Sequence, residues 1–419
     1  MLRTIKDADF AGKKVIMRVD FNVPLKDGVI TDDTRIKAAL PSIKYILEQG
    51  PSGLILMSHL GDPVKDTKKA MEKAQKAGME FDKEKYIQGK HKMAPVAKHL
   101  ESLLSKTVTL ASDSVGSEVE SLAKGLTGGA VLMLENTRFN EGETSKDEAK
   151  REELAKFWAS LADIYVNDAF GTAHRAHAST EGIAHFLPAY AGLLMEKEIQ
   201  YLEPMVTNPP KPMVAIIGGA KVSSKIAVLN SLLKNASALI IGGGMAYTFL
   251  KAQGYEIGTS LVEEDFIDTA KALLEEAKAK GVNIILPVDH QVASKFSADE
   301  TPIYIENKNI PSDKMGMDVG PKTIELYKAV ILAAKSVVWN GPVGVFEFDN
   351  FAKGTQEVAN LVAQCSKNGG MTVVGGGDSV AAVNKFGLKD QMSHVSTGGG
   401  ASLELLEGKV LPGVARLQA

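Results

Sequence analysis

Short, continuously apolar runs alternate with turns and with segments of helical periodicity along the whole chain. Most of these runs are apolar at every position, which is typical of strands that are covered on both faces. Strands that alternate with helices predict parallel sheets built from βαβ units, and therefore an α/β fold. We expect strands at Val15–Val19, Leu54–Met57, Ala130–Leu134, Ile164–Val166, Met213–Ile217, Ala238–Ile241, Ile284–Leu286, Val337–Trp339 and Thr372–Val374.

The residues that follow the predicted strands differ between the two halves of the chain. Polar side chains follow the strands of the first half, at Asp20, Asn22, His59, Asn136, Arg138, Asn167 and Asp168. Glycine clusters follow the strands of the second half, at Gly218–Gly219, Gly242–Gly244, Gly341, Gly344, Gly375–Gly377 and Gly398–Gly400. Ligands of open α/β sheets bind beyond the carboxyl ends of the strands. We therefore expect two domains with different ligands.

The length of 419 residues also favours two domains, because one hydrophobic core rarely grows to this size. A helix is predicted over Leu193–Met205, and the proline-rich segment Asn208–Pro212 ends it. The boundary between the domains is therefore expected near Pro188–Pro212. Segment Asp62–Lys92, rich in both lysine and acidic residues, is expected to be a solvated surface excursion.

Charge and composition exclude several classes of function. Lys and Arg total 48 against 51 Asp and Glu, a formal net charge of −3, so nucleic acid is not expected as a partner. The single cysteine, Cys365, excludes an intramolecular disulfide and a zinc site built from cysteines. No apolar run resembles a signal peptide or approaches the roughly 20 residues of a membrane span. We expect a cytoplasmic protein without a membrane partner.

The glycine clusters predict a site for a nucleotide phosphate. Turns without side chains let backbone N–H groups approach a phosphate, and a following helix N-terminus favours the negative charge. Gly375–Ser379 and Gly398–Ser402 both have this context, between a strand and a helical segment. The P-loop pattern, the dinucleotide fingerprint and the protein-kinase signatures are all missing from the sequence.

Cationic residues lie close to both groups of strand ends. Lys221 and Lys225 are four residues apart, and we expect them to share one face of a helix that opens after Gly218–Gly219. A positioned ammonium group stabilises a phosphoryl group in transfer. In the first half, Arg35, Arg138 and Arg175 combine with His59, His174 and His177 to indicate a small anionic substrate.

Longer motifs resemble the phosphoglycerate kinase family over about residues 5 to 415. Val19–Pro24, Ser58–Gly61, Glu135–Phe139 and Asn167–His177 resemble its triose-phosphate half. The resemblance to the nucleotide half of the family is carried by Gly218–Ile226, Gly242–Leu250, Trp339–Glu347, Gly375–Ser379 and Ser396–Gly408. The resemblance implies two doubly wound domains, joined by a helix and hinge, around a central cleft. The expected division is residues 1–187 with 405–419, a linker at 188–205, and residues 206–404, with Leu411–Ala419 packing on the first domain.

The resemblance also implies the reaction and the residues that perform it. The enzyme would move a phosphoryl group between ATP and the carboxylate of 3-phosphoglycerate. The transfer would be in line, would follow domain closure and would form no covalent enzyme intermediate. The residues implied for 3-phosphoglycerate are Asp20, Phe21, Asn22, Arg35, His59, Arg138, His174 and Arg175. Those implied for the nucleotide are Gly219, Lys225, Gly243, Gly316, Asn340, Pro342, Glu347, Gly376, Gly377, Asp378 and Ser379. Arg35 and Lys221 would neutralise the phosphoryl group, Asp378 would bind Mg²⁺, and the protein would be a monomer.

The sequence departs from the family pattern at two positions. Asp62 stands where the family motif usually has arginine, and Thr137 where an aliphatic residue is commoner. Two other classes of protein remain alternatives at this point. A two-lobed protein could bind a small anion without catalysis, and a nicotinamide-dependent dehydrogenase could share the doubly wound domains. Neither alternative predicts turnover of ATP.

Overall fold

Two six-stranded parallel sheets form the centres of two units in the computed structural model, which describes residues 1–418. One unit contains Met1–Glu198 and Val410–Ala419, and the other contains Ile199–Lys409. The α/β class and the two parallel-sheet domains expected from the sequence are confirmed. The final residue of the expected C-terminal segment, Ala419, lies outside the described residues. Within residues 1–418, no helix is long and apolar enough to span a membrane.

The first sheet has the order β5-β6-β4-β1-β7-β8. Its strands are β1 (Lys14–Arg18), β4 (Gly53–Met57), β5 (Val108–Leu110), β6 (Ala130–Met133), β7 (Ile164–Asn167) and β8 (Ala189–Ala191). Its helices are α1 (Thr34–Glu48), α4 (Ala94–Leu104), α5 (Ser117–Lys124) and α6 (Glu148–Ala159). Val15 and Met17 of β1 join one core cluster with Ile43 of α1 and Leu100 of α4. Ile16, between them, is also buried, so the sheet is covered on both faces, as its apolar runs predict.

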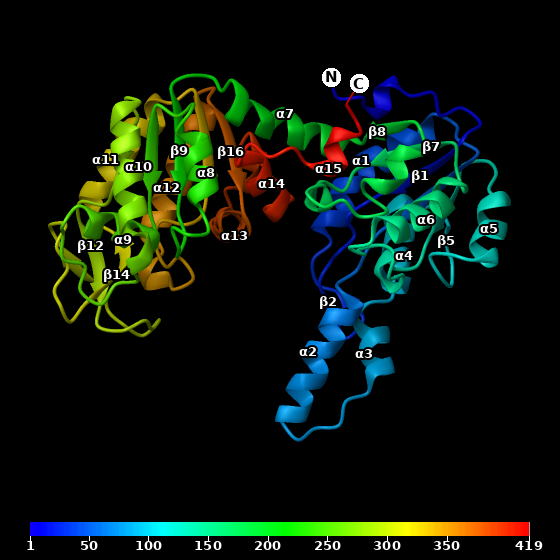
Figure 1. Ribbon diagram of the computed structural model, residues 1–419, viewed down its shortest axis with the longest axis horizontal. Helices are drawn as coiled ribbons and strands as arrows, with labels where there is room; N and C mark the ends of the chain where they lie inside the picture. Colours follow the sequence, from blue (N-terminus) through cyan, green and yellow to red (C-terminus); the bar gives the residue numbers. More distant parts are fainter. Residues whose placement is uncertain (419) are drawn as a thin grey trace. The chain divides into compact units, whose positions relative to one another are not determined.

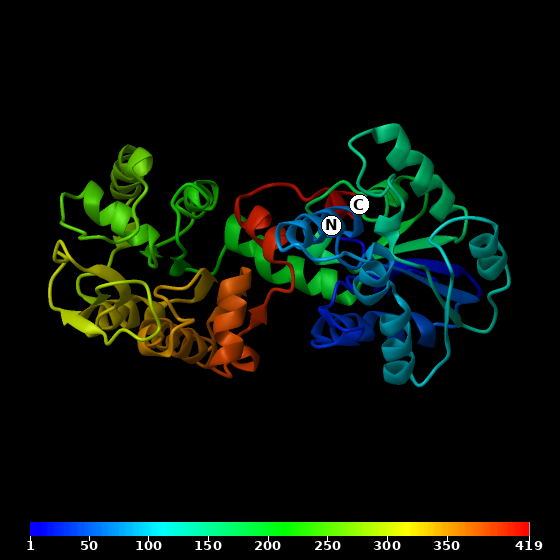
Figure 2. The same ribbon diagram turned by 90° about the horizontal axis from the view of Figure 1, so that it is seen from below.

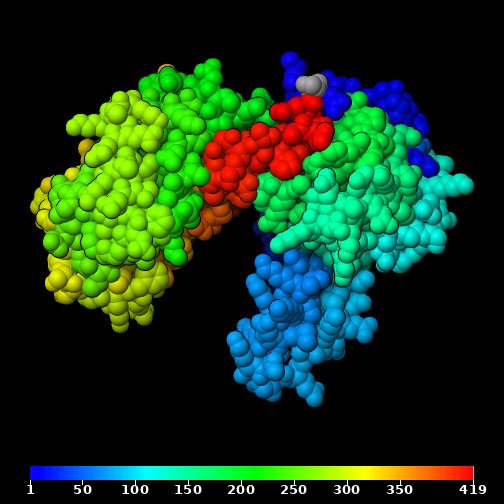
Figure 3. Space-filling view, viewed as in Figure 1, coloured from blue at the N-terminus to red at the C-terminus, as the bar shows by residue number. Residues whose placement is uncertain are grey.

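The predicted surface excursion forms a helical hairpin of α2 (Pro63–Lys76) and α3 (Lys83–Lys90). The two helices project from the first unit as a finger in light blue (Figures 1 and 3). Asp62 caps α2, because its carboxylate oxygen accepts a 3.1 Å hydrogen bond from the amide of Lys65. The residue that departs from the family motif therefore begins this hairpin. Close by, the two-residue strands β2 (Leu25–Lys26) and β3 (Val29–Ile30) pair with each other.

The second sheet has the order β11-β10-β9-β15-β16-β17. Its strands are β9 (Met213–Ile217), β10 (Ala238–Ile241), β11 (Asn283–Ile285), β15 (Ser336–Asn340), β16 (Met371–Gly375) and β17 (His394–Val395). Its helices are α8 (Ile226–Leu232), α9 (Met245–Ala252), α10 (Ile267–Ala279), α11 (Pro321–Ala333), α12 (Lys353–Lys367), α13 (Gly377–Lys385) and α14 (Gly399–Leu406). Trp339 of β15 is fully buried among residues of α11 and α12.

A second, smaller sheet in this unit was not predicted from the sequence. It is antiparallel, with the order β13-β12-β14, and contains β12 (His290–Ala293), β13 (Ile303–Ile305) and β14 (Met315–Val319). The β14 segment, MGMDV, mixes glycine and aspartate with methionine and so has no clear strand pattern. Gly316, which the family resemblance places at the nucleotide, lies on this strand.

Helix α7 (Leu193–Thr207) runs from the first unit into the second, and it confirms the helix predicted at Leu193–Met205. The chain returns to the first unit through α15 (Pro412–Ala415), whose Gly413 amide donates a 2.8 Å hydrogen bond to the carbonyl of Ala173. The two ends of the chain lie side by side (Figures 1 and 2), and the amide of Arg3 donates to the carbonyl of Leu417 at 2.8 Å.

Candidate active site

Asp20, Asn22 and Arg35 meet at the carboxyl end of β1. The Nη1 atom of Arg35 lies 3.2 Å from both carboxylate oxygens of Asp20 and 3.2 Å from the carbonyl oxygen of Asn22. The side-chain oxygen of Asn22 accepts a 2.8 Å hydrogen bond from the amide of Gly61, which follows β4. The side chain of Phe21 instead packs into the core, so it cannot contact a ligand. Two neighbouring strand ends therefore hold Arg35 and Asn22 in place.

His59 follows β4 and is oriented by a buried arginine, Arg18. The Nη2 atom of Arg18 lies 3.0 Å from Nδ1 of His59. Because a guanidinium group can only donate, Nδ1 accepts and the ring proton is assigned to Nε2. Burial, followed by the positive charge of Arg18, holds the pKa of His59 well below its usual range. The imidazole is therefore neutral at physiological pH, and its N–H donor, Nε2, lies on the side of the ring away from Arg18.

Arg138, His174, Arg175 and His177 complete a cluster of arginine and histidine side chains in the first unit. Arg138 donates a 3.0 Å hydrogen bond to the carbonyl of Gly61, and Nε of Arg175 donates to Nε2 of His174 at 3.1 Å. Burial lowers the pKa of Arg138, and the charges of Arg18 and Arg175 add to this effect. Burial, followed by the charges of Arg138, Arg18 and Arg175, lowers the pKa of His177 to about 3. An anionic ligand would relieve this mutual repulsion.

Arg18 and Glu143 form a buried ion pair that the sequence reasoning missed. Their side chains are fully buried and approach to 4.0 Å, and both contact Ser179. Arg18 also donates to the carbonyl of Val19 at 2.5 Å. Burial raises the pKa of Glu143, while Arg18 opposes that rise. The sequence feature that could have indicated this ion pair is the charged residue Arg18 inside the otherwise apolar run Val15–Val19.

The second unit has its site where the strand order reverses, between β9 and β15. The loops after these two strands approach so closely that a Cβ atom on Gly218 would overlap the carbonyl oxygens of Gly341 and Pro342. Gly341 has a φ of 98° and Gly219 a φ of 120°, conformations that favour glycine. Backbone groups, rather than side chains, therefore form this edge of the sheet.

A pocket of about 310 Å³ opens at this edge, and it has the composition of a phosphate site. It is lined by Gly218, Gly219, Ala220, Lys221, Ser224, Lys225, Asn340, Gly341, Gly376, Gly377 and Asp378. The Nζ atom of Lys225 lies 2.5 Å from the side-chain oxygen of Asn340. Burial lowers the pKa of Lys225, whereas Asp378 and Glu407 oppose that effect. An anion in the pocket would favour the charged form of this lysine.

The expected helix containing both lysines is not present. Helix α8 begins at Ile226, Lys225 is its N-cap residue, and Lys221 lies outside it, before the turn at residues 223–225. Ser224 donates a 2.9 Å hydrogen bond to the carbonyl of Lys221, and Ser223 is bound to Glu263. Serine hydroxyls compete in this way with helical hydrogen bonds, which delays the start of the helix. Both lysines nevertheless line the phosphate pocket.

The glycine turn after β16 leads directly into α13, as the sequence predicts. Gly376 has a φ of 88°, and the helix starts at Gly377 with Asp378 in its first turn. Ser379 is fully buried and accepts a 2.5 Å hydrogen bond from the amide of Gly341. It therefore joins two loops of the site and does not line either pocket.

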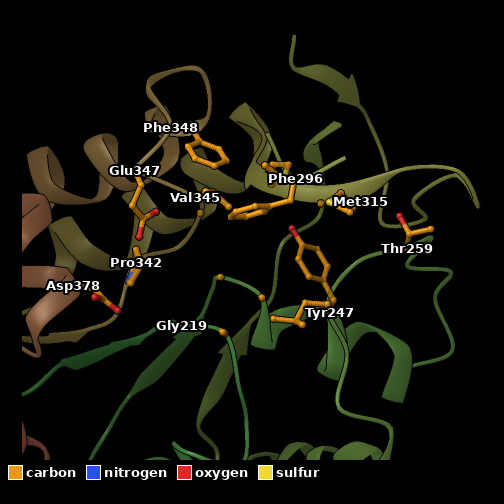
Figure 4. Close-up of a pocket in the computed structure, with 17 residues that line it drawn as sticks. Gly219, Tyr247, Thr259, Phe296, Met315, Pro342, Val345, Glu347, Phe348 and Asp378 are labelled. Atoms are coloured by element: carbon orange, nitrogen blue, oxygen red, sulfur yellow. The ribbon is translucent and has the colours of Figure 1, made fainter. Parts of the chain in front are cut away.

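A larger pocket of about 730 Å³ adjoins the phosphate pocket, because Gly219, Ala220 and Asp378 line both. Its lining also includes Gly243, Gly316 and Pro342 from the predicted nucleotide residues. Figure 4 shows Glu347 and Asp378 at one end and the apolar side chains of Tyr247, Phe296 and Met315 at the other. An apolar chamber next to a phosphate pocket has the volume and polarity of a nucleotide site.

Comparison with known proteins identifies the family of the chain. The family model for phosphoglycerate kinase matches residues 5–409. The phosphoglycerate kinase of Treponema pallidum (strain Nichols) is 57% identical over all of both chains, and that of Thermosipho africanus is 54% identical over 99% of this chain and 97% of its own. The solved structure of phosphoglycerate kinase from Coxiella burnetii has a TM-score of 0.86, with 41% identity over 100% of this chain and 99% of that chain.

The chain belongs to the phosphoglycerate kinase family. Its function is that of a phosphoglycerate kinase, a phosphotransferase with a carboxylate as acceptor, and a nucleotide is one of its substrates. A binding protein without catalysis is not favoured. The phosphoglycerate kinase of Pyrococcus horikoshii, at 32% identity and a TM-score of 0.79 over 100% of this chain and 98% of its own, has the same fold. A cytosolic phosphoglycerate kinase of Nicotiana tabacum is 52% identical over 99% of this chain and 97% of its own.

Proposed function

We propose that the cluster of arginine and histidine side chains in the first unit binds 3-phosphoglycerate and that the two adjoining pockets of the second unit bind ATP. The reaction is 1,3-bisphosphoglycerate with ADP giving 3-phosphoglycerate with ATP, and it is reversible. The observation that carries this assignment is the continuity of the apolar pocket with the phosphate pocket through Gly219 and Asp378. A nucleotide with its base in the first and its phosphates in the second would fill both.

For the acceptor, Arg138 and Arg175 would bind the phosphate, with His59 and His174 as further donors. Asp20 and Asn22 would bind the hydroxyl group and fix the orientation of the carboxylate. Arg35, which Asp20 holds at 3.2 Å, would lie at the reacting carboxylate.

For the nucleotide, Glu347 would accept hydrogen bonds from the ribose hydroxyls, with Gly243, Gly316 and Pro342 around the base and sugar. Lys225, Asn340 and the Gly376–Gly377 turn would contact the phosphates. Asp378 would bind Mg²⁺. Among residues 1–418 no group of three or more His, Cys, Asp or Glu could hold a metal, which suits Mg²⁺ held by one carboxylate and the nucleotide phosphates.

In the transfer step, a carboxylate oxygen of 3-phosphoglycerate attacks the γ-phosphorus atom, and the bond to the bridging oxygen of ADP breaks. Lys221 and Arg35 would neutralise the charge on the phosphoryl oxygens as it moves. When bound, Mg²⁺ supplies further charge neutralisation. Domain closure would bring the two ligands together and exclude water, which would otherwise hydrolyse the acyl phosphate. We propose that the protein acts as a cytoplasmic monomer without nucleic acid or membrane partners.

Equilibrium titrations with each ligand test the assignment of 3-phosphoglycerate to the first unit and of the nucleotide to the second. Glu347→Ala should weaken MgADP binding while leaving 3-phosphoglycerate binding unchanged, and Arg138→Ala should do the reverse. Each loss should be about tenfold or more, as expected when a charge-assisted contact is removed. If either variant weakened both ligands equally, the assignment of one ligand to each unit would be wrong.

A further inference from the structure

The carboxylate of Asp318 lies behind the wall of the nucleotide pocket rather than inside it. Met315, Gly316 and Met317 precede it on β14 and line the pocket. The residue itself is 1% exposed. Burying a carboxylate is costly unless the surrounding groups compensate. The contacts that hold Asp318 in this position therefore indicate what it stabilises.

One carboxylate oxygen of Asp318 is bound to the start of α12. Its Oδ2 atom accepts a 2.7 Å hydrogen bond from the amide of Gly354, the second residue of that helix. The residue before the helix, Ala352, has no side-chain hydrogen bond to offer. Asp318 therefore acts as the cap of α12 from a different strand, at the end of the helix where negative charge is favoured.

The other carboxylate oxygen of Asp318 faces the loop Gly341–Glu347. Within residues 1–418, Oδ1 has no hydrogen-bond partner. It lies against both Gly344 of this loop and Gly354 of α12, and an added Cβ atom at either glycine would overlap it. The same loop is joined to β14 by a 2.8 Å hydrogen bond from the amide of Val345 to the carbonyl of Met317. Asp318 therefore fills the space between β14, this loop and the start of α12.

This loop is also the part of the pocket wall that carries the ribose contact. Pro342, Val345 and Glu347 extend from it around the pocket (Figure 4). Gly243, on the opposite loop, donates a 3.1 Å hydrogen bond to the carbonyl of Val343. A shift of the loop relative to β14 would therefore displace Glu347 and change the width of the pocket.

The groups around Asp318 compensate its charge only partly. Burial raises its pKa to about 7, while the amides of Gly354 and Val319 and the charge of Lys353 oppose that rise. Asp318 also acts electrostatically on Tyr247 of α9 and Tyr327 of α11: burial raises the pKa of both hydroxyl groups, and the charge of Asp318 adds to that rise. Asp289 acts on Tyr327, and the ring of His290 lies beside that of Tyr247, with centroids 5.9 Å apart. None of these groups is a full counter-charge except Lys353.

We infer that Asp318 is a positioning residue for the nucleotide: by joining β14, the Gly341–Glu347 loop and the start of α12, it sets the position of Glu347 in the pocket. The inference rests on the proposed nucleotide site. It assigns no contact with substrate to Asp318 itself. Loss of the carboxylate should weaken the nucleotide and leave the site of the first unit unchanged.

Titration of the full-length protein with MgADP tests this role, with the KM for 3-phosphoglycerate as the internal control. Asp318→Ala removes the charge-assisted hydrogen bond to the Gly354 amide. It should weaken the binding of MgADP about tenfold, with the KM for 3-phosphoglycerate unchanged. Asp318→Asn keeps an acceptor for the Gly354 amide and should recover most of the affinity. It should also reduce the change in MgADP affinity between pH 6 and pH 8. Tyr327→Phe, a neighbouring buried change, should have little effect.

Gly344→Ala tests the contact itself and does not require the alanine variant at position 318 to fold. Alone, it should weaken MgADP, because its Cβ atom would overlap Asp318. Combined with Asp318→Asn it should remain as damaging, whereas combination with Asp318→Ala should recover part of the loss. If folded Gly344→Ala and Asp318→Asn both bind MgADP like the wild type at every pH, the inference is wrong. If Glu347→Ala also had no effect, the nucleotide site itself would be misplaced.

Discussion

The ammonium group of Lys225 lies 2.5 Å from the side-chain oxygen of Asn340. Lys225 precedes α8, and Asn340 ends β15, so the contact joins the two loops where the sheet order reverses. Within the described chain, Nδ2 of Asn340 has no hydrogen-bond partner, and it lies close to Gly376. The pair therefore presents an ammonium group and an amide donor to the phosphate pocket.

Replacement of Lys225 by methionine should raise the KM for MgATP more than it lowers kcat. The lysine is placed to contact the nucleotide in the ground state as well as in the transition state, and such uniform binding appears in KM. We expect an increase of about tenfold or more, because a charge-assisted contact is lost. Lys234→Met, on the exposed end of the same segment, is the matched control. Equal KM values for the two variants would remove Lys225 from the site.

Lys221→Met should show the opposite kinetic pattern. Lys221 is expected to act on the phosphoryl group in transfer, where its contribution is largest in the transition state. We expect kcat to fall by about 10²–10³-fold, the range seen when one transition-state donor is removed, with KM for both substrates nearly unchanged. Steady-state kinetics in both directions measure this. A change confined to KM would place Lys221 among the binding residues.

Asp168→Asn should alter how stability depends on pH. The buried carboxylate of Asp168 accepts hydrogen bonds of 3.0 and 3.1 Å from the amides of Leu194 and Met195, yet burial raises its pKa to about 6. Because the folded pKa is raised, the stability that this group contributes is lost as the pH rises from about 4 through about 6. The asparagine variant keeps an acceptor and lacks this titration.

Chemical denaturation at pH 5 and pH 7.5 measures the effect. The free energy of unfolding of Asp168→Asn should increase relative to that of the wild type at the higher pH, because only the wild type loses stability as Asp168 ionises. Asp163→Asn serves as the control, because Asp163 is exposed but also accepts a backbone hydrogen bond, of 2.8 Å, from Lys14. A relative stability that is the same at both pH values would contradict the raised pKa.

Asp62, which departs from the family motif, has two effects: it caps α2, and its negative charge acts on Arg138. Comparison of Asp62→Asn with Asp62→Ala separates them. Asparagine caps helices as well as aspartate does, so Asp62→Asn should leave α2 intact. It removes a negative charge that acts on Arg138, so the KM for 3-phosphoglycerate should stay equal or fall modestly. Asp62→Ala should lower helix stability by about 1 kcal/mol. Clear weakening of the substrate by Asp62→Asn would show that the carboxylate contributes to the site.

The sheets were predictable because their strands are buried on both faces. Met213–Ile217 and Ala238–Ile241 were predicted with the bounds that β9 and β10 have, since every position in them is apolar. The β12–β14 sheet was not predicted, because its strands pair over long separations and Met315–Val319 has neither alternation nor a continuous apolar run. Its position depends on tertiary contacts such as that between Asp318 and Gly354.

The placement of candidate site residues was predictable where a residue type and its position after a strand agree, as for Asn22, Arg138 and the Gly376–Gly377 turn. Residues that act from inside the protein were missed. Arg18 is hidden in an apolar strand and contacts His59, and Asp318 supports a loop that lies far from it in sequence. The helix expected at Lys221 was wrong, because Ser223 and Ser224 form local hydrogen bonds in its place. The periodicity of apolar residues in the sequence does not indicate such contacts.

The most direct test of the phosphoglycerate kinase function is the formation of 1,3-bisphosphoglycerate from 3-phosphoglycerate and MgATP by the purified protein, in an assay coupled to its reduction by NADH. Wild-type protein should oxidise NADH only when both substrates and Mg²⁺ are present, and Lys221→Met should reduce the rate by about 10²–10³-fold. Correctly folded wild-type protein that binds both ligands and gives no turnover would contradict the account.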